Sequence, residues 1–293
     1  MSKKNNSKKR KKDQRMVQTP FGAMPAEPPP PIEGPSTAMV IMAHPDDAEF
    51  LCSGTVAKWC AEGWHVYYVV ATGGDKGTHD ASMHPEKLAA IREEEQRAAC
   101  RVLGVKECIL LGYPDGFTVD DEELRGQIVG LLRKYKPEVV ITWEPFRGAF
   151  NHRDHRMIGI ATSDAIYPLV RDRLFYPQHE EDGMESHQVN EVLLAGADNA
   201  DYVVDITAYW EKKVDAIVCH TSQIGDRTKE DFLRLRKEQM KREKSKKIEE
   251  RFRRWTIRRP MRQTAAEQEK KEDEADTAAE SGDVKDEASA AAG

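Results

Sequence analysis

The sequence has no run of about 18 apolar residues, so it predicts no transmembrane span. It also has no CxxC pair, because its five cysteines are scattered along the chain. In a chain of 293 residues, long enough for an ample hydrophobic core, this argues against a disulfide framework. Neither the apolar segment of a signal peptide nor the amphipathic stretch of a transit peptide is visible near the N-terminus. These absences together predict a cytoplasmic protein.

Both ends of the chain have the composition of tails. Residues 1–35 begin with lysines and arginines and continue with prolines, and residues 264–293 are acidic and low in complexity. Such segments bury too little apolar surface to offset the entropy lost on ordering, so we expect both to be disordered. Between them we expect a domain at 36–225 and a charged helical extension at 226–263. A basic arm can bind a polyanion, but a solubilising tail has the same composition, and we predict no nucleic-acid recognition from it.

The middle of the chain alternates two kinds of segment. Short apolar runs, rich in β-branched or aromatic residues and typical of buried parallel strands, lie at 38–43, 65–72, 107–112, 138–143, 191–197 and 202–207. Helical patterns lie at 51–62, 85–103, 120–136, 153–172, 208–223 and 227–262. This alternation predicts an α/β fold: a Rossmann-like, doubly wound, mostly parallel sheet with helices on both faces. The last helix is either solvated or packed on a neighbouring subunit, so the sequence leaves a homo-oligomer open.

Glycines and polar side chains follow the first four predicted strands. These strands run into AHPDDAEF, TGGDKGTH, GYPDG and WEPFRGAFNHRDH. Because the carboxyl ends of parallel strands meet at one edge of a sheet, we expect these segments to converge there and to form an active site. TGGDKG matches neither the dinucleotide-binding nor the P-loop pattern, which leaves a nucleotide-binding module as the weaker alternative.

Two of these segments carry the ligand types of a catalytic zinc site. Such a site takes three nitrogen or oxygen ligands from the protein and keeps one position open for water. The segment HPDD offers His44 with Asp46 or Asp47, and NHRDH offers His152, Asp154 and His155. The alternative for HPDD is a helix cap, which needs an aspartate but no histidine. A carboxylate beside the metal suits a general base for hydrolysis of an amide or ester carbonyl, whose oxyanion the metal and a protonated histidine would stabilise.

Taken in order, these segments resemble the PIG-L/LmbE-like zinc-dependent N-deacetylases of the GlcNAc deacetylase superfamily. The resemblance rests on AHPDDAEF, TGGDKG, AAIREEEQRAACRVLGV, GYPDG, NHRDH and CHTSQ, and runs from about Ala38 to about Gln223. It implies that zinc is bound by His44, Asp47 and His155. It also implies that Asp46 is the general base on the zinc-bound water. Another divalent transition metal suits the same ligands.

The resemblance implies roles for five further residues. His152 would lie beside the substrate carbonyl and stabilise the oxyanion, and Asp154 would orient a histidine. Arg92 would contact the sugar, and Asp115 would hold a sugar hydroxyl. His220 of CHTSQ would act near the active site as a general acid.

The expected reaction removes an acetyl group from a small-molecule, N-acetylglucosamine-type substrate, by attack of zinc-bound water on the amide carbonyl. The residues themselves predict metal-assisted hydrolysis of a carbonyl compound, whereas the acetamido sugar comes only from the resemblance. Two alternatives stay open: a related zinc amidase acting on another acyl group or a thiol conjugate, and a non-catalytic binding protein, against which the presence of Asp46 argues. In the variable segment 171–189, His179 and His187 are expected to be loop residues rather than ligands.

Overall fold

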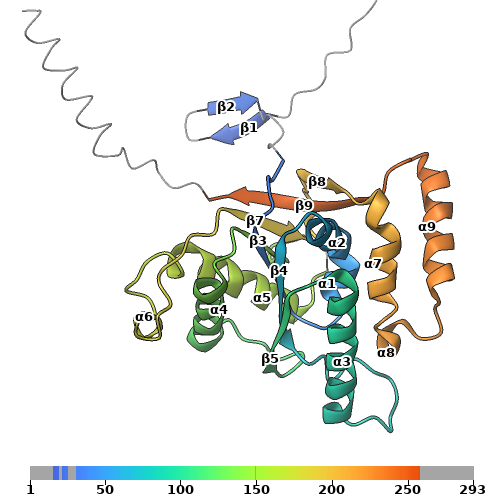
Figure 1. The fold of residues 1–293 in the computed structure, drawn as a ribbon, viewed down its shortest axis with the longest axis horizontal. Helices are drawn as coiled ribbons and strands as arrows, with labels where there is room; N and C mark the ends of the chain where they lie inside the picture. Colours follow the sequence, from blue (N-terminus) through green and yellow to red (C-terminus); the bar gives the residue numbers. More distant parts are fainter. Residues whose placement is uncertain (1–15, 20–21, 26–30, 149, 258–293) are drawn as a thin grey trace, which may run out of the picture. The chain divides into compact units, whose positions relative to one another are not determined.

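A computed structural model describes residues 16–19, 22–25, 31–148 and 150–257 of the protein. At its centre lies a seven-stranded sheet with the order β5-β4-β3-β6-β7-β9-β8 (Figure 1). Its strands are β3 (Thr37–Met42), β4 (His65–Thr72), β5 (Glu107–Tyr113), β6 (Val139–Trp143), β7 (Glu191–Ala195), β8 (Tyr202–Asp205) and β9 (Glu249–Thr256). The five strands from β5 to β7 are parallel, and β9 runs antiparallel to both of its neighbours.

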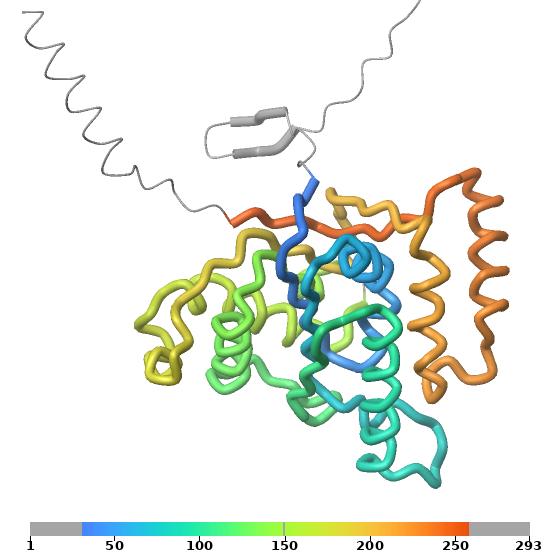
Figure 2. The backbone as a smooth tube through the Cα atoms, in the orientation of Figure 1, coloured from blue at the N-terminus to red at the C-terminus, as the bar shows by residue number. Residues whose placement is uncertain are grey.

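Helices cover both faces of the sheet in two groups (Figure 1). One group contains α1 (Asp47–Leu51), α2 (Ser53–Ala61), α3 (Pro85–Leu103), α7 (Trp210–Ile217), α8 (Thr221–Ile224) and α9 (Lys229–Glu243). The other contains α4 (Glu122–Tyr135), α5 (Arg153–Asp164) and a π-helical turn (Ala165–Leu169), with the short α6 (Gln178–Glu181) further along the chain. Although far apart in the sequence, α3 and α7 lie side by side (Figure 2). The predicted doubly wound α/β architecture is confirmed.

Local sequence explains the most regular elements. The residues of β3 from Ala38 to Met42 are all buried, as expected for a central parallel strand with helices on both faces. The helix α3 has the predicted bounds 85–103, because Pro85 suits the first turn and Gly104 ends the helix with a φ of 89°. The predicted helix 153–172 ends earlier, at Asp164, and continues only as the π-helical turn that contains Pro168.

The order of the strands places a topological switch point between β3 and β6. Starting from β3, the chain adds β4 and β5 on one side, then returns to add β6 and β7 on the other. The loops that leave β3 and β6 therefore diverge, and ligands of such sheets bind between them at the carboxyl edge. His44 follows the end of β3 by two residues, and the segment with His152 follows β6.

The region 226–263, predicted as a helical extension, differs from that prediction after α9. Residues Glu249–Thr256 form β9, which lies between β7 and β8 in the same sheet as the predicted domain. The inward positions of this strand include Phe252 and the buried Glu250. The Glu250 carboxylate accepts the amide N–H groups of Gly54 and Thr55, at 2.9 and 2.7 Å, at the start of α2. Because the inward residue Glu250 is charged, the sequence of this strand has the pattern of a solvated helix.

The predicted tails lie mostly outside the described residues. Within the first of them, β1 (Met16–Thr19) and β2 (Gly22–Pro25) pair antiparallel, which differs from the disorder predicted there. The predicted acidic tail, 264–293, lies entirely outside the described residues. Among the helices that the structure describes, none is long and apolar enough to cross a membrane.

Candidate metal centre and active site

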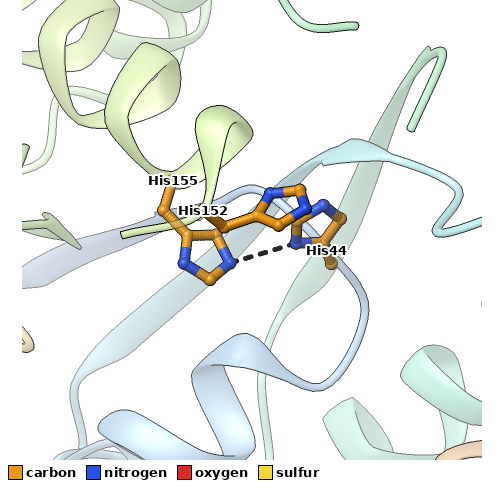
Figure 3. A group of neighbouring side chains, drawn as sticks. All are labelled: His44, His152 and His155. Carbon is orange, nitrogen blue, oxygen red and sulfur yellow. Dashed lines mark hydrogen bonds between the residues drawn. The ribbon is translucent and has the colours of Figure 1, made fainter. Parts of the chain in front are cut away.

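The three residues expected to bind a metal lie together at the carboxyl edge of the sheet. His44 Nδ1 is 3.2 Å from His155 Nε2, which is 3.3 Å from Asp47 Oδ1. His44 Nδ1 is also 3.6 Å from Asp47 Oδ2. The nitrogens of His44, His152 and His155 form a further group within 4.8 Å (Figure 3). The structure thus brings together side chains from the segments after β3 and β6.

The carboxylate of Asp47 is held by donors on one oxygen. Its Oδ2 accepts the backbone N–H groups of Ala43 and His44, at 3.2 and 2.9 Å, and the indole N–H of Trp143 at 3.0 Å. Burial would raise the pKa of Asp47, but its contacts with His155 and His44 outweigh burial and hold the pKa well below its usual range. The carboxylate is therefore ionised, and Oδ1 faces His155.

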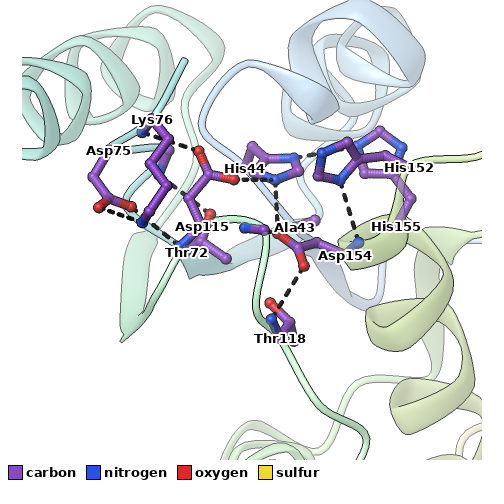
Figure 4. A network of polar contacts seen from close by, with 12 residues as sticks. Ala43, His44, Thr72, Asp75, Lys76, Asp115, Thr118, His152, Asp154 and His155 are labelled. Atoms are coloured by element: carbon purple, nitrogen blue, oxygen red, sulfur yellow. Dashed lines mark hydrogen bonds and ion pairs between the residues drawn. The ribbon is translucent and has the colours of Figure 1, made fainter. Parts of the chain in front are cut away.

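The other ring nitrogen of His44 faces two carboxylates (Figure 4). His44 Nε2 lies 3.1 Å from Asp115 Oδ1 and 3.2 Å from Asp154 Oδ2. Burial lowers the pKa of His44, but hydrogen bonds with Asp115, Asp154 and Asp47 raise it to about 11. An Nε2–H that donates to a carboxylate fixes the ring orientation and leaves Nδ1 to face Asp47 and His155, the arrangement usual for a metal-binding histidine.

Asp154 is wholly buried, and its carboxylate links the start of α5 to the loop that follows β5. Its oxygens accept the N–H groups of Gly116 and Thr118, at 2.6 and 3.1 Å, and Asp154 itself lies in the first turn of α5. Asp154 Oδ2 also lies 3.2 Å from His44 Nε2, so His44 is the histidine that the Asp154 carboxylate contacts.

Asp46 has an unusual backbone conformation. Its φ of 92° and ψ of −26° lie in the left-handed region, which is rare for residues other than glycine. Its carboxylate is 18% exposed, and Oδ2 accepts a hydrogen bond from Arg92 Nη2 at 3.3 Å. Burial, followed by the charge of Asp47, raises the pKa of Asp46 to about 7, although Arg92 opposes this rise.

His152 presents one of its ring nitrogens to the backbone. Its Nδ1 accepts the N–H of Asp154 at 3.2 Å, at the start of α5. An accepting Nδ1 carries no proton, so the hydrogen of the neutral ring lies on Nε2. Burial, with the neighbouring His44 and His155, lowers the pKa of His152. The neutral ring can donate one hydrogen bond, which differs from the protonated histidine expected from the sequence.

Arg92, expected to contact the sugar, and His220, expected to act as a general acid, are more buried than those roles suggest. Arg92 is 4% exposed, and its guanidinium donates to the carbonyls of Gly74 and Pro45, at 2.9 and 2.6 Å. A Cβ at Gly74 would clash with that guanidinium, so a glycine is needed for this approach. His220 is wholly buried, with Nε2 3.2 Å from Glu49 Oε2, a position that does not suit a general acid in contact with substrate.

Asp115, His187 and His179 complete the set of residues considered from the sequence. Asp115 is 7% exposed in the site, where Oδ2 accepts the N–H of Lys76 at 3.2 Å. His187 Nε2 lies 2.8 Å from the carbonyl of Pro137, and His179, in α6 rather than a loop, stacks on Tyr176. Neither histidine belongs to the groups described above.

Three residues that support the site, Trp143, Gln96 and Glu49, were not predicted from the sequence. Trp143 holds Asp47 and also stacks on His155, with ring centroids 3.7 Å apart. Gln96 and Glu49 are wholly buried, and Gln96 accepts the N–H of Asp46 at 3.0 Å. Trp143 ends β6, so its place at the carboxyl edge was the one available signal. Gln96 lies inside a long helix, where its polar side chain resembles any solvated one.

Comparisons with known proteins show what this chain is similar to. The sequence profile of the PIG-L family, described as GlcNAc-PI de-N-acetylase, matches residues 39–166. The chain is 31% identical over 201 residues to the diacetylchitobiose deacetylase of Thermococcus kodakarensis, covering 67% of this chain and 73% of that protein. It is 26% identical over 234 residues to the 1D-myo-inositol 2-acetamido-2-deoxy-alpha-D-glucopyranoside deacetylase of Actinosynnema mirum, covering 66% of this chain and 82% of that protein. A solved structure of N,N'-diacetylchitobiose deacetylase from Pyrococcus horikoshii, in complex with its inhibitor MPG, is 29% identical, with a TM-score of 0.69 over 77% of this chain and 87% of that one.

Proposed function

Because this chain belongs to the PIG-L family, we propose that it is a metal-dependent N-deacetylase acting on an N-acetylglucosamine-type small molecule. The observation that carries the proposal is the meeting of three donor atoms: His155 Nε2 lies 3.2 Å from His44 Nδ1 and 3.3 Å from Asp47 Oδ1, and Asp46 is adjacent in the chain. The names of two relatives, which describe deacetylases of acetamido sugars, support the substrate class.

The donor set fits zinc. Bonds of about 2.0–2.1 Å in a tetrahedral site place neighbouring donors about 3.3 Å apart, close to the separations observed here. Two imidazoles and an ionised carboxylate also suit zinc and similar divalent transition metals. His44, Asp47 and His155 would hold the ion. A bound ion would supply the Lewis acidity that polarises the amide carbonyl and lowers the pKa of water to about 7.

Asp46 is the proposed general base. Its partly exposed carboxylate can take a proton from the attacking water and pass it to the sugar nitrogen as the C–N bond breaks. The products are acetate and the free amine, so the proton that Asp46 takes up is returned within one turnover. Asp46 is poised for this transfer because Arg92 holds one carboxylate oxygen at 3.3 Å.

His152 and Asp115 are the proposed substrate contacts. The Nε2–H of His152 can donate to the carbonyl oxygen as negative charge develops on it. Each oxygen of Asp115 has one partner in the protein, His44 or the N–H of Lys76, and retains a lone pair that can accept a sugar hydroxyl.

The test is acetate release from N-acetylglucosamine compounds by metal-stripped and metal-restored protein. We expect release from diacetylchitobiose or an N-acetylglucosaminyl inositol only after one equivalent of zinc is restored. Matched N-propionyl sugars and an amide thiol conjugate distinguish a broader amidase. Release from those compounds alone would contradict the proposed substrate class, and equal release by the stripped protein would contradict the metal requirement.

A further inference from the structure

Helix α3 holds the peptide group between Pro45 and Asp46 on both sides. Arg92 Nη2 donates to the Pro45 carbonyl at 2.6 Å, and Gln96 Oε1 accepts the Asp46 N–H at 3.0 Å. Arg92 and Gln96 are four residues apart, so both side chains project from the same face of the helix. Both polar groups of this peptide, the Pro45 carbonyl and the Asp46 N–H, are therefore hydrogen-bonded to side chains of α3.

The two hydrogen bonds from α3 hold a peptide group next to a residue with a strained backbone conformation, Asp46. Asp46 has a φ of 92°, and a left-handed conformation is strained for a residue other than glycine. Such a conformation persists only where the surrounding structure fixes it. A change in this peptide would also redirect the Asp46 carboxylate.

A second buried contact determines which way the Gln96 amide points. Gln96 Nε2 donates to Glu49 Oε1 at 3.1 Å, which turns Gln96 Oε1 toward the Asp46 N–H. Glu49 Oε2 in turn lies 3.2 Å from Nε2 of His220, within ion-pair distance but without the geometry of a hydrogen bond. Gln96, Glu49 and His220 are all 0% exposed, and a wholly buried carboxylate is costly unless it is paired.

We propose that Gln96, Glu49 and His220 form a positioning chain for Asp46. His220 faces the Glu49 carboxylate, Glu49 orients the Gln96 amide, and Gln96 fixes the Asp46 peptide. The inference rests on the proposed function, in which Asp46 is the general base. It gives His220 a positioning role in place of the general-acid role expected from the sequence, and it adds Gln96 and Glu49 as positioning residues.

The test exchanges the two ends of the central hydrogen bond. In Gln96→Glu, two carboxylates face each other in a buried place, so the Asp46 peptide loses its fixed partner. In the double variant Gln96→Glu/Glu49→Gln, the new glutamate can accept both the Asp46 N–H and an amide N–H of residue 49. The amide oxygen of residue 49 can then face His220. The control is Cys100→Ala, which removes the other contact of Gln96 Nε2, 3.7 Å from Cys100 Sγ.

The kinetic outcome separates positioning from general loss of structure. A misplacement of about 1 Å costs about 100-fold in rate, so we expect Gln96→Glu to lose about that factor in kcat with unchanged KM and metal content. The double variant should regain at least about tenfold of this loss, and Cys100→Ala should stay within about twofold of wild type. A double variant no better than Gln96→Glu, or Cys100→Ala as impaired as Gln96→Glu, would overturn the proposal.

Hydrogen exchange at the Asp46 amide gives a readout that needs no substrate. We expect this amide to be protected in the metal-loaded wild type, to exchange faster in Gln96→Glu and to be protected again in the double variant. Equal protection in all three proteins would overturn the positioning chain, whatever their activities. If wild type released no acetate, this exchange pattern would still support the chain, while the proposed deacetylase function would fail.

Discussion

The indole ring of Trp143 lies parallel to the imidazole of His155, with ring centroids 3.7 Å apart and an interplanar angle of 10°. The same indole donates its N–H to Asp47 Oδ2 at 3.0 Å. One side chain at the end of β6 therefore orients two of the three proposed metal ligands. This relationship connects the packing of the central sheet to the geometry of the site.

Replacement of Trp143 by phenylalanine should weaken metal binding. Trp143→Phe keeps an aromatic ring against His155 but removes the donor to Asp47. Loss of a residue that orients a ligand typically costs about 10- to 100-fold in metal affinity. Competition titration of zinc with a chelator measures this change. The matched control is Trp59→Phe, because Trp59 is also buried but stacks on Trp64; equal effects of the two substitutions would contradict a specific role for Trp143.

Zinc binding should release protons at neutral pH. The pKa of His44 in the metal-free protein is raised to about 11, as hydrogen bonds with Asp115, Asp154 and Asp47 outweigh burial. The ring is therefore protonated at pH 7, and a metal ion that takes Nδ1 must displace a proton. We expect release of about one proton per ion and an affinity that rises about tenfold per pH unit between pH 7 and 9. Calorimetry in buffers of different ionisation enthalpy measures the release, and heats independent of the buffer would contradict it.

Replacement of Glu250 should lower the free energy of unfolding, because this residue forms a buried ion pair with Lys213. Glu250→Ala leaves the ammonium of Lys213, itself 5% exposed, without its carboxylate and removes the acceptor at the start of α2. Breaking a buried ion pair in this way lowers the free energy of unfolding by about 3–5 kcal/mol.

Urea denaturation measures this loss. The control is Glu249→Ala on the same strand, whose partner Arg251 is exposed and whose loss should cost about 0–1 kcal/mol. Similar losses in both variants would show that β9 is not anchored through Glu250.

Most of the sheet could be predicted because its strands are covered on both faces. Strands such as β3 and β6 are continuous apolar runs, and the end signals of α3, Pro85 and Gly104, are local. The strand β9 could not be recognised, because its inward Glu250 is neutralised by Lys213 and its Arg254 pairs with Glu191. A charged inward position looks like a solvent position until its partner is known.

For the site, the sequence predicts which side chains meet but not how they are oriented. The residue types after β3 and β6 indicate which side chains meet, because parallel strands end at one edge. They do not indicate the orientation of each side chain: that His44 turns Nε2 toward Asp154, or that Arg92 is buried against Pro45, depends on tertiary packing. For the same reason Gln96, in the middle of α3, became visible as a partner of Asp46 only in the structure.

The measurement that tests the account most directly compares wild type with Asp46→Asn, both loaded with zinc, for acetate release from diacetylchitobiose. Asparagine keeps the size of the side chain but cannot accept the proton of the attacking water. General-base catalysis contributes about 10²- to 10⁴-fold, so we predict a loss of that size in kcat while bound zinc stays near one per chain. An Asp46→Asn variant that releases acetate as fast as wild type would contradict Asp46 as the base and with it the proposed mechanism.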